Sequence, residues 1–250
     1  MLEQSGSVDV NVLAEKFKTS KETIRRDLRE LEIDGALTRT HGGAVLNKTN
    51  DQESSREYPV AIRGIQRFAE KKQICKKAAS FIQDNDTIFV DNSSTMLYLA
   101  EFIPPEKNIT VITNSIKFLL EASKSFSPNH VFVCLGGIFK ENNLSVYGNI
   151  CLKNAEEYFP DKTFISCAGI SPRNMLADSS IQEINIKRVM MERAREVFLL
   201  ADYTKFQKSG SIFLTGFDSV NYVITDDKAD LSSLGYLEKN NIKLIVSDMQ

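Results

Sequence analysis

The chain has 250 residues, of which 42% are hydrophobic, and its formal net charge is −2 at pH 7. That length suits one large domain with a small one beside it, and the hydrophobic share is ordinary for a globular protein. A net charge this close to zero argues against a protein that coats nucleic acid by bulk positive charge, so any DNA contact must be a local basic patch.

The sequence also argues against membrane insertion, secretion and a metal centre. Its longest apolar runs fall far short of the roughly 18–20 residues that cross a bilayer, and the N-terminal segment lacks the basic and apolar regions of a secretory signal. The two histidines do not stand at ligand spacing to a cysteine, so neither a zinc site nor a cofactor is predicted. We therefore expect a cytoplasmic protein whose isolated cysteines are reduced and buried: Cys75, Cys134, Cys151 and Cys167.

A helix-turn-helix is predicted at the start of the chain. Val12, Leu13 and Phe17 stand at helical spacing, and residues 18–20 leave only a tight turn before the next helical pattern. Two short extended pieces around a glycine pair follow at 38–45, and such a hairpin is typical of a wing.

The second helix of this pair has one apolar edge and an outward arc of basic side chains. Ile24, Leu28 and Leu31 recur at i, i+4 and i+7, the pattern of a helix packed by a single face. Ser20 is a good N-cap, and residues 19–22 also fit a capping box, so two starts remain open. Acidic residues balance the basic ones, and the helix by itself could equally be an ordinary solvated one.

The segments ETIRRDLRELE and LTRTHGGAV resemble the N-terminal winged helix-turn-helix of the DeoR family of bacterial sugar-metabolism repressors, almost without a gap from Ser7 to Leu46. The resemblance implies that the second helix lies in the major groove of operator DNA, where arginine can read guanine and hydroxyls can donate or accept. Which arginine reads a base stays open. The implied DNA contacts are Ser20, Lys21, Thr23, Arg25 and Arg26 in the helix, and Arg39 and His41 in the wing.

Compared with that family, the chain begins late, because members carry roughly a dozen more residues before the position of Glu3. We therefore expect a winged-helix domain at 1–46 whose first helix is truncated, and weak DNA binding as a result.

Residues 47–57 are polar and non-periodic, which predicts a linker between domains. A helical pattern follows from about 59 to 83, with Ile74 and Ala78 on its apolar edge. The predicted division is a winged-helix domain at 1–46, a linker with the start of a connecting helix at 47–69, and an effector domain at 70–250.

The rest of the chain alternates between short β-rich runs and helical segments. Runs that are apolar on both faces and separated by helices predict a mostly parallel sheet covered on both sides, so the fold class is α/β. The predicted strands are 87–91, 109–114, 130–135, 163–169, 197–202, 221–226 and 242–248.

Polar residues follow four of these strands, at the edge where open α/β sheets bind ligands. Hydroxyls and free N–H groups before a predicted helix at 96–102 suit a phosphate, a glycine pair permits close backbone approach, and a lysine could supply positive charge. Each alone is more often a cap, a turn or a surface lysine, but together they predict a site for a small anion. The residues are Asp91, Asn92, Ser93, Ser94, Thr95, Asn114, Gly136, Gly137 and Lys205.

The segments DNSSTMLYLA, VITNS, LGG with VYG at 146–148, and LADYTKF resemble the DeoR sensor domain, whose fold is similar to ribose-5-phosphate isomerase and glucosamine-6-phosphate deaminase. The resemblance implies a phosphorylated sugar as effector and, with the winged helix, covers most of the chain. The family loop usually reads Asp-x-Gly-Ser-Thr. Ser93 stands here where glycine is usual, and a left-handed backbone at that position would be strained.

Two functions compete for the sensor: a repressor domain that binds its effector, and an isomerase that carries an extra domain. An isomerase needs a carboxylate at the substrate carbon with others that set its pKa, and none follows the strand that ends near Ile170. Glu183 aligns with the isomerase glutamate, yet beside Lys187 and Arg188 it is also commonly a surface ion pair. We therefore expect binding without turnover, with Glu183 as a sugar-hydroxyl acceptor.

A bare oligomerisation domain is a third reading, but it would not need polar residues at successive strand ends. Because two-fold operators usually demand a two-fold protein, we expect a dimer or a tetramer.

Overall fold

The computed structural model describes residues 7–33, 37–40, 42–46, 60–125, 127–171, 175–207 and 210–247. The chain divides into two compact units, residues 1–66 and 67–250, and each is treated by itself. The second unit thus begins at Arg67, inside the stretch predicted as linker and connecting helix. No helix within these described ranges is long and apolar enough to span a membrane.

In the described part of the N-terminal unit, two helices joined by a tight turn and a three-stranded antiparallel sheet with the order β1-β3-β2 form the predicted helix-turn-helix with its wing. Lys18 lies in the left-handed region, with φ 50°, and closes the turn between the helices. The elements are β1 (Ser7–Asp9), α2 (Val10–Lys16), α3 (Lys21–Ile33), β2 (Leu37–Arg39) and β3 (Gly43–Leu46), and α4 (Val60–Ile65) follows later in the same unit.

The buried face of α2 differs from the predicted one. Val10, Leu13 and Ala14 are buried, at i, i+3 and i+4, whereas Val12 and Phe17 are largely exposed. The helix begins one residue after Asp9, whose carboxylate accepts from the backbone N–H of Val12, and this start turns Val12 outward. Phe17 follows the last helical residue. On α3 the predicted edge is confirmed, since Ile24 and Leu28 are buried and Leu31 packs against the same core.

One glycine of the predicted pair is required by close packing. A β carbon on Gly43 would lie 1.8 Å from the backbone oxygen of Val8 on the paired strand β1. No side chain fits there, so the sheet of the N-terminal unit depends on this glycine.

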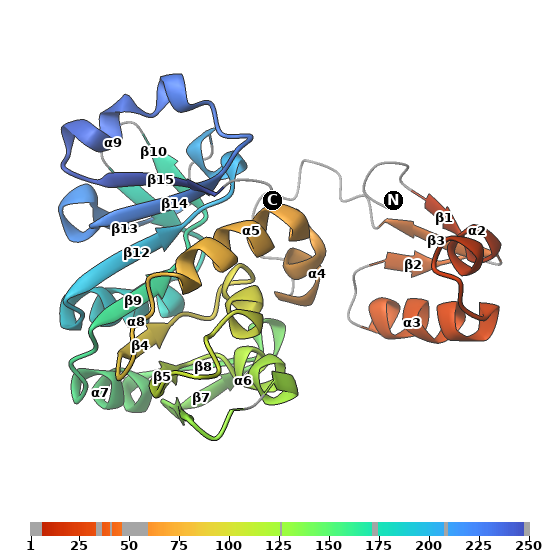
Figure 1. Cartoon of the computed structure of the whole chain (residues 1–250), viewed down its shortest axis with the longest axis horizontal. Helices are drawn as coiled ribbons and strands as arrows, with labels where there is room; N and C mark the ends of the chain where they lie inside the picture. The colour runs from red at the N-terminus through yellow and green to blue at the C-terminus, as the bar shows by residue number, and fades with distance from the viewer. Residues whose placement is uncertain are drawn as a thin grey trace. The chain divides into compact units, whose positions relative to one another are not determined.

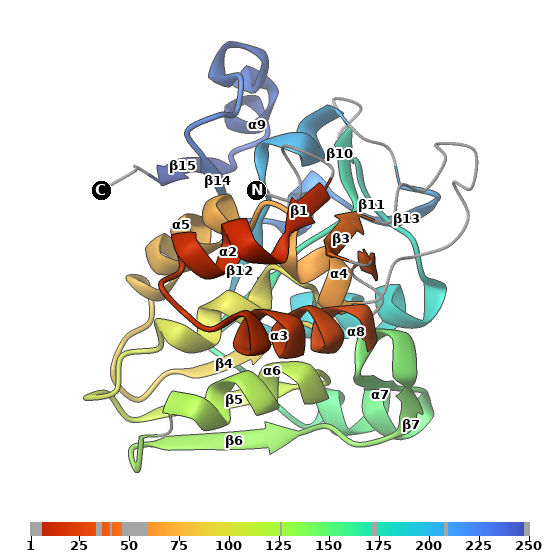
Figure 2. The same cartoon turned by 90° about the vertical axis from the view of Figure 1, so that its right-hand side faces the viewer.

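The larger unit is built on a seven-stranded sheet in which every strand pairing is parallel. All seven predicted strands are present in it. Figure 1 shows them in the order β15-β14-β12-β9-β4-β5, and Figure 2 shows β4, β5 and β6 side by side. The strands are β4 (Thr87–Val90), β5 (Ile109–Thr113), β6 (His130–Cys134), β9 (Lys162–Ile165), β12 (Glu196–Leu200), β14 (Tyr222–Asp226) and β15 (Lys243–Ser247).

The strand order creates a switch point between β4 and β9. From β4 the chain moves outward through β5 to β6, and it then returns to β9 on the other side of β4 and moves outward through β12 to β15. The connections on the two sides diverge there, and open α/β sheets bind ligands outside the carboxyl ends of the strands at such a switch point. The predicted effector residues follow these and the neighbouring strands.

Helices cover both faces of the sheet. On one face Phe198 packs against Phe81, which follows α5, with ring centroids 5.3 Å apart. On the opposite face Phe89 belongs to the same core as Met190 of α8. The helices are α5 (Phe68–Ala79), α6 (Ile116–Ala122), α7 (Asn149–Glu156), α8 (Ile181–Arg193) and α9 (Gly235–Lys239), with 3-10 turns η1 (Met96–Glu101), η2 (Ser123–Ser125), η3 (Glu141–Asn143), η4 (Tyr203–Gln207), η5 (Phe217–Ser219) and η6 (Leu231–Ser233).

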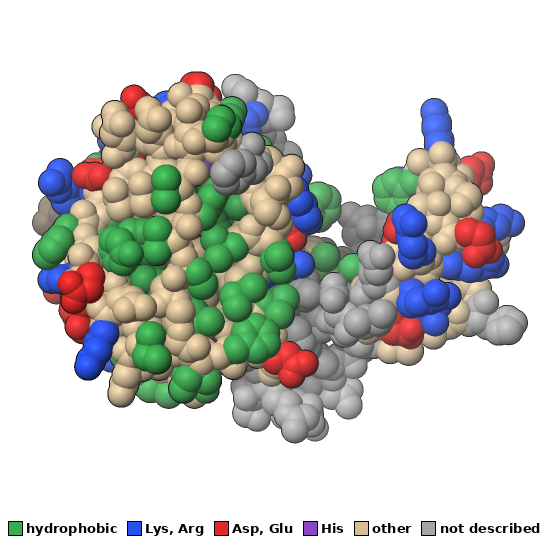
Figure 3. Space-filling view, turned by 90° about the horizontal axis from the view of Figure 1, so that it is seen from below, with side chains coloured by type: hydrophobic (Ala, Val, Ile, Leu, Met, Phe, Trp, Pro, Cys, Tyr) green, Lys and Arg blue, Asp and Glu red, His purple; other side chains and the backbone are tan. Residues whose placement is uncertain are grey.

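In the described part of the larger unit, five short antiparallel strands lie outside the predicted set. Strands β7 (Ile138–Lys140) and β8 (Ser145–Tyr147) form a hairpin, and β10 (Gly169–Ser171), β11 (Met175–Asp178) and β13 (Ile212–Gly216) form a small sheet. Large apolar side chains remain exposed on β6, β7 and α7, and Figure 3 shows apolar side chains spread over one face of this unit.

The cysteine prediction is wrong for Cys134, which is exposed, because β6 is an edge strand with a neighbour on one side only. The other three cysteines are free and buried, as predicted. Burial raises the pKa of Cys151 to about 12.

Candidate functional site

The predicted recognition helix α3 begins with a side-chain cap. The hydroxyl of Ser20 accepts from the backbone N–H of Thr23 at 3.1 Å, so Ser20 is the N-cap of the two candidates. The two hydroxyls also lie 2.9 Å apart. Both groups therefore define the start of the helix as well as being candidate DNA contacts.

The basic side chains of α3 differ in their exposure and in how closely they pair with carboxylates. Arg25 forms an ion pair with Glu22 one turn earlier. Arg26 is 70% exposed, and its Nε lies 3.9 Å from a carboxylate oxygen of Asp27. Lys21 is exposed at the first turn. Arg26 and Lys21 are thus more available to a partner than Arg25.

The wing residue Arg39 is held by the recognition helix. Its Nε donates to Oε2 of Glu32 at 2.7 Å, and its backbone N–H donates to Oε1 at 2.9 Å. These hydrogen bonds lower the pKa of the Glu32 carboxyl. The pair fixes the wing strand against the end of α3, and the other predicted wing contact, His41, lies outside the described residues.

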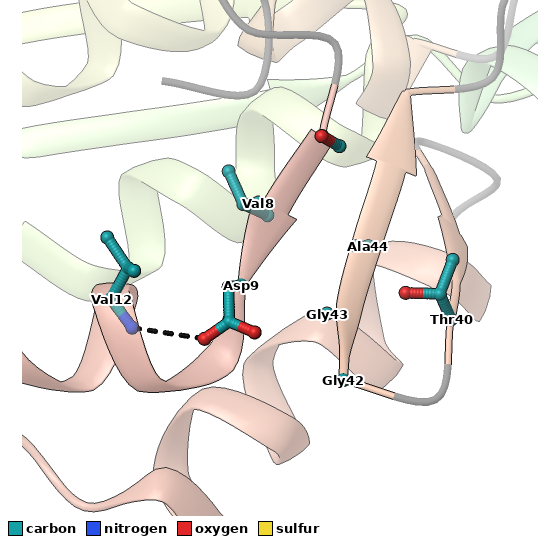
Figure 4. Close-up of a pocket in the computed structure, with 8 residues that line it drawn as sticks. Val8, Asp9, Val12, Thr40, Gly42, Gly43 and Ala44 are labelled. Atoms are coloured by element: carbon teal, nitrogen blue, oxygen red, sulfur yellow. Dashed lines mark hydrogen bonds between the residues drawn. The ribbon is translucent and has the colours of Figure 1, made fainter.

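A hollow of about 500 Å³ opens in the N-terminal unit between β1, the start of α2 and the wing (Figure 4). Asp9 lies in it, but one of its carboxylate oxygens already caps α2. The hollow belongs to the N-terminal unit and is not the anion site predicted at the strand ends. Its lining residues are Ser7, Val8, Asp9, Val12, Thr40, Gly42, Gly43 and Ala44.

In the larger unit, three of the predicted effector residues have buried polar atoms without a hydrogen-bond partner among the described residues. These atoms are Oδ1 of Asn92, Oγ of Ser93 and Oδ1 of Asn114. Buried polar groups are nearly always paired, so such atoms at adjacent strand ends indicate a missing polar partner. Two amide oxygens suit hydroxyl donors, whereas a hydroxyl can also donate to an anion.

Strand β8 brings these residues together. Nδ2 of Asn114 donates to the backbone oxygen of Val146 at 3.1 Å, and Nδ2 of Asn92 lies 3.2 Å from the hydroxyl of Ser145. Because a backbone oxygen only accepts, the first contact fixes which end of the Asn114 amide points away from β8. The side-chain oxygens of Asn92 and Asn114 are therefore the atoms that remain without a partner.

Asp91, which was predicted to contact the effector, is engaged within the protein. Its Oδ1 accepts from the backbone N–H of Ser93 at 2.8 Å, and its Oδ2 accepts from that of Ser166 at 3.0 Å. The second bond joins the ends of β4 and β9 across the switch point. The ammonium of Lys187 lies 3.2 Å from the same Oδ2. Asp91 therefore shapes the loop instead of presenting a free carboxylate.

Lys187, which the sequence left open as a partner of Glu183 in a surface ion pair, is buried. Its ammonium donates to Asp178 at 2.5 Å and to the backbone oxygen of Ser166 at 2.8 Å, and all three residues are buried. Burial opposes the charged form, but Asp178 and Asp91 outweigh it, so the pKa of Lys187 lies above its ordinary value.

Glu183 is likewise buried and is not in a surface ion pair with Lys187 or Arg188. Its Oε1 accepts from the ammonium of Lys140 at 2.8 Å and from the side chain of Asn143. Both partners come from the β7–β8 hairpin. This hairpin also contacts Asn92 and Asn114, so it is a common neighbour of all three of these predicted effector residues.

The glycine pair and Lys205 occupy other parts of the same edge. Gly136 and Gly137 have φ of 72° and 121°, and a β carbon on Gly137 would lie 2.5 Å from the backbone oxygen of Tyr147. The close approach is thus to β8. Lys205 lies in η4, after β12, and its charge acts against the burial that raises the pKa of Cys167 to about 12.

Two expectations about the loop 91–95 change. The segment after it is a short 3-10 helix, η1, with i to i+3 bonds such as Tyr98 N–H to Thr95, so the phosphate argument loses its α-helix N-terminus. Ser93 is not among the residues with positive φ, and serine is tolerated in place of glycine without left-handed strain. Ser94 accepts from the ammonium of Lys71 on α5 at 3.1 Å.

Two buried lysines, Lys71 and Lys187, were missed, although a signal was present. Lys71, Ile74 and Ala78 are spaced i, i+3 and i+7 on the apolar stripe of α5. On α8, Lys187 lies three residues after Ile184 on the corresponding stripe. A lysine on an apolar stripe is buried with its charge and needs a partner. Within the described ranges, no group of three His, Cys, Asp or Glu side chains could hold a metal ion.

Two family models match the chain. One, described as the DeoR-like helix-turn-helix domain, matches residues 1–50, and one described as the DeoR C terminal sensor domain matches residues 66–227. The first match lies in the N-terminal unit and the second spans most of the larger unit.

Several curated proteins are similar to this chain over nearly their full length, and they are transcriptional regulators. The chain is 35% identical to YulB, an uncharacterized HTH-type transcriptional regulator of Bacillus subtilis, over 95% of this chain and 90% of that protein. It is 32% identical to the L-fucose operon activator of Escherichia coli, over 91% and 92% of the two chains. It is 31% identical to the regulator IolR of Bacillus subtilis, over 95% and 92%.

Solved structures with a similar arrangement include ribose 5-phosphate isomerase A from Methanocaldococcus jannaschii, with 17% identity and a TM-score of 0.40 over 54% of this chain and 53% of that chain. A translation initiation factor eIF-2B from Pyrococcus horikoshii aligns with 14% identity and a TM-score of 0.43 over 65% of each chain. At this level the likeness concerns the fold and says nothing about a reaction.

Proposed function

This chain belongs to the DeoR family of transcriptional regulators, and from that premise we propose that it is a repressor of a sugar-metabolism operon. Operator DNA binds to α3 and the wing, and a phosphorylated sugar binds at the strand ends of the larger unit without turnover. The protein acts in the cytoplasm, where its operator is.

The observation that carries the effector part is the group of three unpaired buried atoms on Asn92, Ser93 and Asn114. Amide oxygens accept from sugar hydroxyls, while the Ser93 hydroxyl and the Lys205 ammonium can bind a phosphate, which offers only acceptors at neutral pH. No described carboxylate pairs with Lys205, so its charge is available to an anion. A ligand with both hydroxyls and a phosphate satisfies the whole set.

Binding without turnover is favoured over isomerisation by the state of Glu183. A general base must reach the substrate proton with a free carboxylate oxygen, and here one of the two oxygens, Oε1, already accepts from Lys140 and Asn143. We expect the purified protein to leave pentose and hexose phosphates unchanged, as followed by proton NMR of the sugar.

Replacing Ser93 with alanine is expected to separate ligand binding from stability. The hydroxyl has no partner in the free protein, so its loss should leave the free energy of unfolding unchanged or slightly higher. A hydrogen bond to a charged group is worth about 1.5–3 kcal/mol, so the affinity for a sugar phosphate should fall about tenfold to hundredfold. A thermal-shift screen of sugar phosphates, the matching free sugars and inorganic phosphate selects the ligand, and calorimetry measures its affinity.

Ser127→Ala is the matched control. Its hydroxyl donates to the backbone oxygen of Pro105 at 2.7 Å, near the amino ends of β5 and β6, on the opposite edge of the sheet. This change should lower stability by about 1 kcal/mol and leave ligand affinity intact. Stabilisation by free sugars but not by their phosphates would contradict the anion site.

Self-association is part of the same proposal. A two-fold operator is read by two equivalent recognition helices, so the repressor should be a dimer or a tetramer. Light scattering after size-exclusion chromatography should give a mass of two or four chains of 28.1 kDa at micromolar concentration. A monomer under these conditions would contradict this part.

A further inference from the structure

The first turn of α5 contacts the loops that follow three different strands of the sheet. Arg67, just before the helix, has its Nε 3.9 Å from Oδ1 of Asp202, after β12. Glu70 accepts from the ammonium of Lys228, after β14. Lys71 donates to Ser94 at 3.1 Å, after β4.

Two of these loops belong to the candidate effector site. Ser94 is the neighbour of Ser93, whose hydroxyl is buried and unpaired. Asp202 begins the turn that carries Lys205, and its backbone oxygen accepts from the Lys205 N–H at 2.9 Å. A ligand that binds Ser93 or Lys205 therefore acts on loops to which the first turn of α5 is attached.

This turn is also where the chain leaves the N-terminal unit. The boundary between the two units falls between Gln66 and Arg67. Arg67 has φ 52° and ψ 40°, a left-handed conformation that a residue with a side chain seldom adopts. Such a conformation persists where surrounding contacts hold it. One of the surrounding contacts is that of its guanidinium with the buried Asp202.

We propose that the first turn of α5, formed by Arg67, Glu70 and Lys71, reports effector occupancy to the DNA-binding unit. The inference rests on the proposed function, and it adds the route by which the bound sugar phosphate controls DNA binding. A ligand shifts a conformational equilibrium only through contacts that differ between the two states. The ion pairs of Arg67 and Glu70 with the strand-end loops are those contacts.

The test uses the full chain with Arg67→Asn and Glu70→Gln combined. Asparagine tolerates the left-handed region, so the backbone is kept while both ion pairs are removed. Lys72→Gln is the matched control, because it breaks a 2.7 Å ion pair of the same helix with Glu101, on η1 and away from the strand ends. Circular dichroism confirms that each variant is folded.

Three quantities are measured for each protein. Calorimetry gives the affinity for the sugar phosphate with the largest thermal shift, and fluorescence anisotropy gives the affinity for a DNA fragment selected from random sequence, with and without that sugar phosphate at saturation. Allosteric coupling typically changes affinity about 5-fold to 150-fold, so we expect the wild type and the Lys72→Gln control to respond at least fivefold. The double variant should respond less than about twofold while binding each ligand alone within threefold of wild type.

A double variant that responds like the wild type overturns the inference and leaves the proposed function standing. A double variant that no longer binds the sugar phosphate also overturns it, since the turn would then be part of the binding site. A wild type that binds no sugar phosphate overturns the proposed function and this inference with it.

Discussion

Replacing Lys187 with methionine is expected to lower the free energy of unfolding of the larger unit by about 3–5 kcal/mol, because the change leaves buried carboxylates without their counter-ion. The lysine ammonium lies 2.5 Å from Asp178 and 3.2 Å from Asp91. Methionine matches the length and volume of the side chain, so lost packing contributes little. The loss is electrostatic and should also loosen the loop that Asp91 shapes.

The charge on Lys187 persists through the pH range of such experiments. Its pKa in the folded state is raised, so its contribution is complete below the unfolded value of about 10.4 and is lost only as pH rises through the folded value. The difference between variant and wild type should therefore be constant from about pH 6 to pH 9, provided that the carboxylates stay ionised.

Urea unfolding followed by tyrosine fluorescence measures this effect. The chain has no tryptophan, and all of its tyrosines except Tyr58 lie in the larger unit. Lys72→Met, which breaks the exposed pair with Glu101, should cost about 0–1 kcal/mol. A loss of less than about 1 kcal/mol for Lys187→Met as well would show that the carboxylates find other partners, against the expectation for a buried pair.

The central sheet could be predicted from sequence because its strands carry their own signal. Runs such as 87–90 and 196–200 are apolar on both faces, and only a strand covered on both sides explains that pattern. The five antiparallel strands have three to five residues each, and they are defined by their pairing, which for β11 and β13 joins segments separated by α8 and β12. Their pairing partners are set by the tertiary fold, which a local pattern does not encode.

The candidate site could be predicted at the level of its loops but not of its individual side chains. Asn92, Ser93 and Asn114 were found because polar residues follow buried strands. Asp91 was assigned with them, yet its carboxylate is engaged by Ser166 and Lys187, more than 70 residues away in the chain. Such long-range contacts decide whether a polar group is free for a ligand, and no spacing reveals them.

Replacing Arg26 with alanine is expected to weaken operator binding by about 1–3 kcal/mol, roughly fivefold to 150-fold. Arg26 is the most exposed arginine of α3 with a described ion pair, and its carboxylate is 3.9 Å away, while Arg25 is paired more closely with Glu22. Its guanidinium can therefore give up the contact with Asp27 and bind a base edge or a phosphate with little loss of free energy.

Anisotropy titrations with the selected operator and with random DNA, at several salt concentrations, distinguish the two contacts. If Arg26 reads a guanine, operator binding falls while random DNA is bound almost as before; if it contacts a phosphate, both fall and the salt slope decreases by about one. Arg195→Ala is the control, since Arg195 is 80% exposed in the larger unit and its loss changes the net charge equally. Equal affinities for the two variants would exclude Arg26 from the interface and shift the reading role to Arg25, whose pair with Glu22 would then have to open on DNA.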